Sequence, residues 1–105
     1  KQRINNVKFP MEVDITARHF TLSKNLRETV GQKVQKILKF NQIIITCQIV
    51  LTKESHNEKA EIILHLKGKD FIATHSSESF EKSINMVVDK IISQLKKQHD
   101  KLIKH

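Results

Sequence analysis

The last quarter of the chain, residues 79–105, constrains the fold more than any other feature, because it reads as one long amphipathic helix. Its apolar residues recur at spacings of three and four, which at about 100° per residue form a single stripe. At roughly 1.5 Å per residue the helix is about 37 Å long, more than a small domain needs to cover its core. The stripe weakens after Leu95, so we expect the second half of the helix to project as a basic extension. The stripe consists of Phe80, Ile84, Val87, Val88, Ile91 and Leu95, and the opposite side carries Lys82, Lys90, Lys96, Lys97, Lys101 and Lys104.

The rest of the chain alternates between strand and helix patterns. A period of two predicts a strand over 11–16, and a run of β-branched residues predicts another over 43–52. Two further strands, over 60–67 and 71–76, follow after short polar turns. Between the first two strands, residues 24–39 carry an apolar stripe of helical period behind the capping residues Thr21 and Ser23. Gly31 lies in the middle of this helix at a cost of about 1 kcal/mol relative to Ala, which the close approach of a neighbouring helix would explain.

The order of these elements, strand, helix, strand, strand, strand, helix, defines an α+β fold class. Short turns join the last three strands into an antiparallel meander, and the helical connection places the first strand parallel to its neighbour by a right-handed crossover. Both helices have only one apolar face, and the polar side of the strands suits water. We therefore predict a two-layer sandwich, β-α-β-β-β-α, with a four-stranded sheet and two roughly parallel helices on one face.

A chain of 105 residues has the size of one domain. We expect a single α+β domain over residues 11–105 and a disordered or artificially added extension over residues 1–10, which show no period. The longest apolar run is far shorter than the ~20 residues that cross a membrane, so no membrane partner is expected. The single cysteine, Cys47, excludes an internal disulfide and favours a cytoplasmic protein. We expect the free protein to be monomeric.

The formal charge of +8 is unevenly placed along the chain. Basic residues outnumber acidic ones in both predicted helices, whereas the two kinds are equal in number over 43–76. The helices would therefore present their polar backs as one basic surface, which is typical of polyanion binding. A solvated helix back is the alternative interpretation. Because lysine acts as a point charge on phosphate, binding would follow the shape of the backbone more than its sequence. The absence of Tyr and Trp favours structured RNA or a duplex over a splayed single strand.

The sequence offers little for catalysis. The six histidines are scattered without a ligand-pair spacing, so neither a metal nor another cofactor is expected. We interpret Cys47, between Ile45 and Ile49 on one strand face, as a buried apolar residue, and His75 as an edge-of-core residue beside Phe71. No nucleophile–base arrangement or carboxylate pair can be assembled. We therefore expect no catalytic residues and a protein that is not an enzyme.

Three segments together resemble a known family. The strand start MEVDITARHF, the helix LRETVGQKVQKILKF and the closing DKIISQLKKQHDKLIKH occur in the family's order over residues 11–105. The chain is thereby similar to the ribosome hibernation promoting factor and ribosome-associated inhibitor A family, also described as sigma-54 modulation proteins. Because the sequence ends directly after the last helix, it resembles the short form of the hibernation factor, without a dimerisation domain. Two positions depart from the family pattern, Ser93 where a basic residue is usual and Glu81 where an aromatic one is.

The resemblance implies a ribosome hibernation factor. Such a factor binds the small ribosomal subunit and its rRNA in the channel of messenger and transfer RNA, silences translation in stationary phase, and acts with a separate ribosome modulation factor to pair ribosomes. The main alternative is a generic double-stranded RNA-binding module, which the strand-strand-strand-helix portion resembles, although Phe80-Glu81-Lys82 lacks that module's lysine cluster. The rRNA-binding residues expected from the basic surface and the resemblance are Lys24, Arg27, Lys33, Lys36, Lys82, Lys90, Lys96, Lys97, Lys101 and Lys104.

Overall fold

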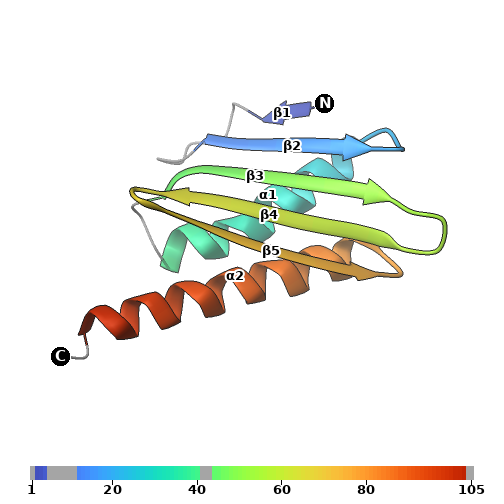
Figure 1. Cartoon of the computed structure of the whole chain (residues 1–105). Helices are drawn as coiled ribbons and strands as arrows, with labels where there is room; N and C mark the ends of the chain where they lie inside the picture. Colours follow the sequence, from blue (N-terminus) through green and yellow to red (C-terminus); the bar gives the residue numbers. More distant parts are fainter. Residues whose placement is uncertain (1, 5–11, 41–43, 104–105) are drawn as a thin grey trace.

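The protein is a mixed β-sheet that is covered on one face by two helices (Figure 1). The computed structural model describes residues 2–4, 12–40 and 44–103. The elements are β1 (Gln2–Ile4), β2 (Glu12–Arg18), α1 (Lys24–Phe40), β3 (Ile44–Lys53), β4 (Glu58–Leu66), β5 (Lys69–Ser77) and α2 (Phe80–Ile103). The predicted order β-α-β-β-β-α and its α+β class are confirmed from β2 onwards.

The sheet has the order β1-β2-β3-β4-β5. The parallel pair β2–β3 and the antiparallel meander β3–β4–β5 are as predicted, but β1 adds a fifth strand that pairs antiparallel with β2. The expectation of a disordered segment is therefore wrong for residues 2–4, which pair with the backbone groups of β2 that a four-stranded sheet would leave open at its edge. The predicted start of the first strand, Met11, lies outside the described residues.

The register builds the core in rows across the sheet. In β2–β3–β4–β5 order, one row is Val13–Cys47–Leu64–Phe71 and the next is Ile15–Ile49–Ile62–Ala73. Because side chains alternate across a strand, these rows point to the same face. All of these side chains are buried, and Val30, Val34 and Ile37 of α1 and Ile84, Val87 and Ile91 of α2 pack against them.

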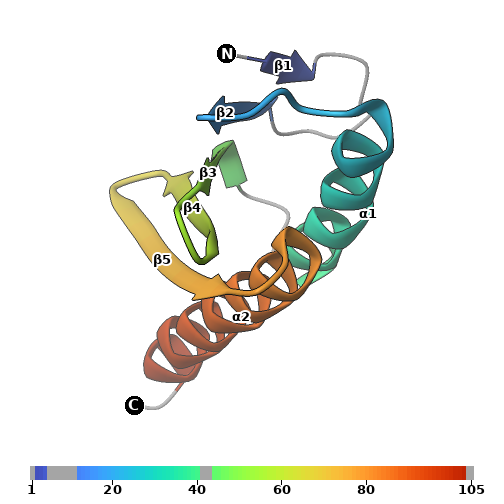
Figure 2. The same ribbon diagram turned by 90° about the vertical axis from the view of Figure 1, so that its right-hand side faces the viewer.

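Both helices lie on the concave side of the sheet, as Figure 2 shows. They run in the same direction, so they begin at one end of the molecule and finish at the other (Figure 1). The opposite face of the sheet is mostly polar, as expected, but Ile72 is 55% exposed there. Gly31 has open space around it, since a Cβ at this position would meet nothing within 4 Å. The idea that a close helix requires glycine at position 31 is therefore wrong.

Candidate nucleic-acid interface

The end where both helices begin is fixed by capping and ring contacts. Ser23 caps α1 by accepting a hydrogen bond from the Leu26 backbone N–H at 3.0 Å, and Ser79 caps α2 in the same way through Lys82 at 3.2 Å. The rings of Phe20, just before α1, and Phe80, the first residue of α2, stack with centroids 4.6 Å apart. The two helices are thereby held in register, so their later turns advance side by side toward the other end.

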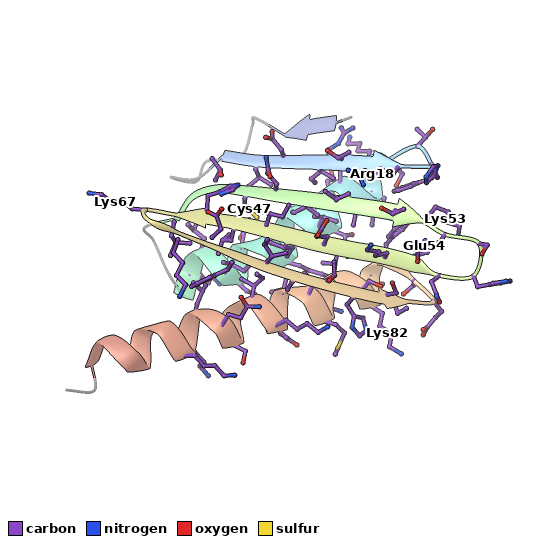
Figure 3. The ribbon with its side chains drawn as sticks, viewed as in Figure 1. Arg18, Cys47, Lys53, Glu54, Lys67 and Lys82 are labelled. Carbon is purple, nitrogen blue, oxygen red and sulfur yellow. The ribbon has the colours of Figure 1, made fainter. Side chains whose placement is uncertain are left out.

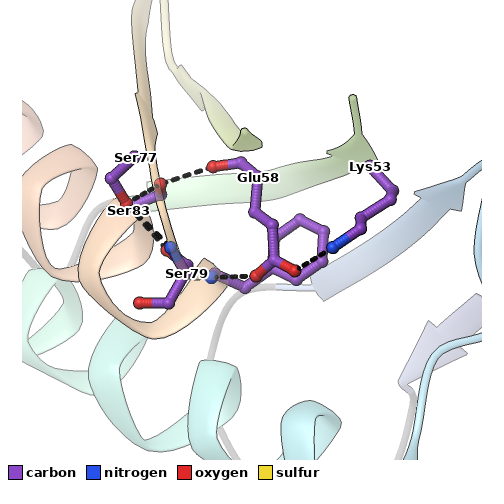
Figure 4. A network of polar contacts seen from close by, with 6 residues as sticks. Lys53, Glu58, Ser77, Ser79 and Ser83 are labelled. Atoms are coloured by element: carbon purple, nitrogen blue, oxygen red, sulfur yellow. Dashed lines mark hydrogen bonds and ion pairs between the residues drawn. The ribbon is translucent and has the colours of Figure 1, made fainter. Parts of the chain in front are cut away.

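A polar network joins the start of α2 to the β3–β4 hairpin (Figure 4). One carboxylate oxygen of Glu58 accepts a hydrogen bond from the Phe80 backbone N–H at 2.6 Å, and the other accepts one from Lys53 at 2.6 Å. The fully buried Ser83 donates its hydroxyl hydrogen bond to the Glu58 carbonyl at 2.6 Å and its oxygen lies 2.7 Å from the Ser77 hydroxyl oxygen. A carboxylate of the protein itself therefore occupies the anion-attracting N-terminus of α2.

On α1 the candidate residues differ in accessibility. Lys24 and Lys36 are exposed, whereas Arg27 and Lys33 are half-buried. Arg27 also interacts within the protein. A lysine at the border of the apolar stripe covers the core with its stem and keeps its ammonium group in water, so Lys33 is still able to reach a phosphate. Lys36 is the α1 candidate that lies furthest from the core.

On α2 two candidate lysines already have partners. Lys82 forms an exposed ion pair with Glu78 at 3.3 Å, and a backbone hydrogen bond together with Lys82 lowers the pKa of Glu78. Lys90 donates a hydrogen bond to the Thr74 carbonyl at 2.8 Å, and Gln94, one turn later, donates one to the Ile72 carbonyl at 3.1 Å. These two side chains cover the open edge of β5, which protects an edge strand from pairing with another chain. Lys90 is therefore a structural residue in the free protein.

The second half of α2 supplies the most accessible candidates. Lys96 and Lys97 are exposed, and among the described side chains no carboxylate pairs with either of them. Lys101 belongs to the last turns of α2, where only the backbone is described, and Lys104 lies outside the described residues. The expectation that α2 carries its accessible lysines beyond the packed half is met by Lys96 and Lys97.

The fold separates charges along its long axis. At the end where the helices begin, Arg18, Lys53 and Lys82 lie near Glu54, and Lys67 lies at the opposite end (Figure 3). The first end is close to neutral, because Glu58 and Glu78 pair with Lys53 and Lys82 there. The other end gathers the basic residues of the later helical turns and of the β4–β5 turn, namely Lys33, Lys36, Lys39, Lys67, Lys69, Lys96 and Lys97.

Sequence reasoning missed Lys67 and Lys69 in this basic end. They lie in a segment whose charges sum to zero, so the charge count over 43–76 gave no signal. In space, the carboxylates of that segment are mostly at the β3–β4 hairpin, whereas Lys67 and Lys69 flank Gly68 at the other end of the strands. Counting charges separately at each predicted turn would have found them.

The remaining chemically capable residues are structural. Cys47 is buried, and burial raises the pKa of its thiol from 9.0 to about 12, so it is a protonated core residue, as predicted. His75 is half-buried on the face of Phe71, also as predicted. The Nδ1 atom of His65 lies 2.8 Å from an oxygen of Asp70 across the β4–β5 hairpin. No group of three residues able to hold a metal ion occurs among the residues described here.

Within the described part of the chain, neither helix combines the length and the apolar composition that a membrane crossing requires. The helices are instead two-sided, with buried residues on one stripe and charged residues on the other.

The fold is shared with proteins of the ribosome. A ribosomal subunit interface protein from Coxiella burnetii superposes with a TM-score of 0.79 at 20% identity, covering 84% of this chain and 97% of the other. The N-terminal domain of Protein Y from Thermus thermophilus superposes with a TM-score of 0.72 at 18% identity, covering 87% of this chain and 98% of that one.

At the level of sequence, the chain belongs to the Sigma 54 modulation protein / S30EA ribosomal protein family, which matches it over residues 13–103. A ribosome hibernation promoting factor from Klebsiella oxytoca is 30% identical over 95 residues, covering 90% of this chain and all of the relative. The protein of the same name from Azotobacter vinelandii is 28% identical over 93 residues, covering 89% and 87% respectively. The resemblance that the sequence indicated is confirmed.

Proposed function

We propose that the protein is a ribosome hibernation factor, not an enzyme, that binds the small ribosomal subunit at the decoding channel of messenger and transfer RNA. The observation that carries this proposal is the family match over residues 13–103, with relatives named ribosome hibernation promoting factor along nearly the whole domain. The bound protein silences translation by excluding messenger and transfer RNA, and promotes ribosome dimers in stationary phase together with ribosome modulation factor. The free protein is a cytoplasmic monomer.

The basic side of the helices supports contact with ribosomal RNA. The accessible lysines Lys36, Lys96 and Lys97 lie in the later turns of two helices that run side by side. Lysine contacts phosphate oxygens without reading bases, so such a surface recognises the shape of folded RNA. Each phosphate contact releases counterions, which makes the affinity fall steeply with salt. The contacts proposed for Lys24, Arg27, Lys33, Lys82, Lys90, Lys101 and Lys104 remain to be sorted by mutation.

The partially covered candidates rank lower within this proposal. Lys82 and Lys90 would have to give up an ion pair or a backbone hydrogen bond before they bound phosphate. An exposed ion pair such as that of Lys82 is weak, so its loss is a small obstacle. We therefore rank Lys36, Lys96 and Lys97 first, and Lys90 last among the residues with described side chains.

The test is co-sedimentation of the protein with ribosomes at increasing salt, followed by a sucrose gradient with and without ribosome modulation factor. We expect binding to single ribosomes at low salt and a shift into dimers when the modulation factor is added. The Lys36→Ala/Lys96→Ala variant should bind more weakly. The Lys59→Ala variant, altered on the opposite face of the sheet, is its matched control. Wild-type protein that remains free at low salt would overturn the proposal.

A generic double-stranded RNA-binding module is the alternative, because α1-β3-β4-β5-α2 has the helix and strand order of that module. The start of α2 speaks against it. The Glu58 carboxylate occupies the Phe80 N–H there, and Lys82 is paired with Glu78. Equal affinity for a plain RNA duplex and for ribosomes would favour the alternative, whereas a large preference for ribosomes excludes it.

A further inference from the structure

We propose that Lys67 and Lys69 of the β4–β5 turn, together with Lys97 of α2, form a second phosphate-binding cluster that contacts an RNA strand on the β5 flank of α2. We call these three residues the turn cluster. The inference rests on the proposed function, since the RNA would be ribosomal, but it concerns a surface separate from the one between the helices.

Helical geometry places Lys97 on the flank of α2 that faces β5. Lys90 marks this flank, because its ammonium group donates to the Thr74 carbonyl at 2.8 Å. Lys97 follows seven residues later, close to two complete turns, so its side chain leaves the helix in nearly the same direction. Lys97 is exposed, and it is therefore directed away from the surface between α1 and α2.

The strand register brings the turn to the same level. Seven residues advance α2 by about 10 Å, which corresponds to about three residues of an extended strand. Since β5 runs in the opposite direction to α2 (Figure 1), the level of Lys97 corresponds to Phe71, three residues before Thr74. The ammonium group of Lys69 lies 5.5 Å from the centroid of the Phe71 ring.

Alternation along β5 keeps the neighbouring carboxylate away from the cluster. Lys69 shares the face of Phe71, which is the face that the helices cover. Asp70 points to the other face, where its oxygen lies 2.8 Å from Nδ1 of His65. The acidic residue next to the turn therefore contributes little to neutralising the Lys69 side.

The turn itself presents Lys67 to solvent. Gly68 has a φ of 80°, in the left-handed region that glycine adopts without strain, and this allows Lys67 and Gly68 to close a two-residue connection between Leu66 and Lys69. Lys67 is exposed and projects from the tip of the hairpin (Figure 3). A compact turn with cations on both sides of a glycine matches a ribose–phosphate backbone, which carries a negative charge at every nucleotide.

The experiment compares the Lys67→Gln/Lys69→Gln variant with wild-type protein in ribosome co-sedimentation over a range of salt. Glutamine keeps most of each side-chain stem and removes the charge. The matched control is Arg18→Gln/Lys59→Gln, which removes two charges from the outer face of the sheet near the opposite end. We expect the slope of log affinity against log salt to fall in magnitude by about 1.4–1.8 for the turn variant, at roughly 0.7–0.9 per phosphate contact, and to stay unchanged for the control.

A second measurement reads the lysines directly. Wild-type protein, free and ribosome-bound, is treated with an amine-acetylating reagent and the modified lysines are identified by mass spectrometry. We expect Lys67 and Lys97 to be protected in the complex and Lys59 to remain reactive. If wild-type protein binds ribosomes but Lys67 stays reactive and the salt slope of the variant is unchanged, the turn cluster is wrong and the proposed function stands. Protection of Lys67 with an unchanged slope would indicate a carboxylate-bearing protein partner and would also overturn the RNA assignment. Failure of the wild-type protein to bind would instead overturn the proposed function.

Discussion

The side chain of Glu58, at the start of β4, accepts a hydrogen bond from the backbone N–H of Phe80, the first residue of α2, at 2.6 Å. The two residues are 22 positions apart in the sequence. The contact supplies a negative charge at the positive end of the helix dipole, next to the local Ser79 cap. The orientation of α2, and hence of its lysines, therefore depends on the β3–β4 hairpin.

Replacing Glu58 by Ala should lower the free energy of unfolding by about 1–2 kcal/mol, because the Phe80 N–H and Lys53 both lose their acceptor. The measurement is urea unfolding followed by circular dichroism. Glu54→Ala is the control, since Glu54 is exposed in the same hairpin. Equal unfolding midpoints for the two variants would show that the contact does not stabilise α2.

The arrangement of elements was predictable because each segment had a clear period. The alternation in 43–52 and the stripe in 79–105 place their elements within a few residues of β3 and α2. The strand β1 was not predictable, since three residues without a period give no local signal. Its pairing depends on the open edge of β2, which exists only once the sheet has formed.

The candidate site was predictable in part. Helical periodicity identified the exposed positions Lys36, Lys96 and Lys97, whose side chains need nothing but a helix to face solvent. The role of Lys90 was hidden, because it depends on a backbone carbonyl of β5. Lys67 was hidden by charge counting along the chain, since the fold sends oppositely charged residues of one segment to opposite ends of the sheet.

The two glycines should respond to alanine in opposite directions. Gly31→Ala should raise the free energy of unfolding by about 0.5–1 kcal/mol, because it lies within α1 and a Cβ there meets nothing within 4 Å. Gly68→Ala should lower the free energy by about 1 kcal/mol or more, because its φ of 80° is strained for alanine. Urea unfolding of both variants checks this pair, and destabilisation by Gly31→Ala would reveal a constraint on α1 other than space.

The buried thiol of Cys47 predicts a pH dependence of stability. Burial raises its pKa from 9.0 to about 12, so the native state holds the proton more tightly than the unfolded state does. The resulting stabilisation is fully present below pH 9.0 and is lost as the pH rises from there toward 12. Comparison with Cys47→Ala isolates this effect from the titration of lysines. The stability difference between wild type and variant should shrink by about 1.4 kcal/mol per pH unit above 9, as measured by urea unfolding at pH 8 and pH 10. A difference that stays constant would contradict it.

Lys90 and Lys36 should separate stability from ribosome binding, although both are exposed lysines of the basic helices. Lys90→Ala removes the hydrogen bond to the Thr74 carbonyl and should cost about 0.5–1.5 kcal/mol of stability. The same change leaves an acceptor of β5 open to water, so its effect on ribosome affinity should be small. Lys36→Ala should leave the unfolding midpoint nearly unchanged and should reduce the salt slope of ribosome binding by about 0.7–0.9. The two measurements, urea unfolding and co-sedimentation over a range of salt, are made on both variants. If Lys90→Ala weakens binding as much as Lys36→Ala while the protein stays equally stable, Lys90 exchanges Thr74 for a phosphate when the ribosome binds, and the edge of β5 becomes part of the interface.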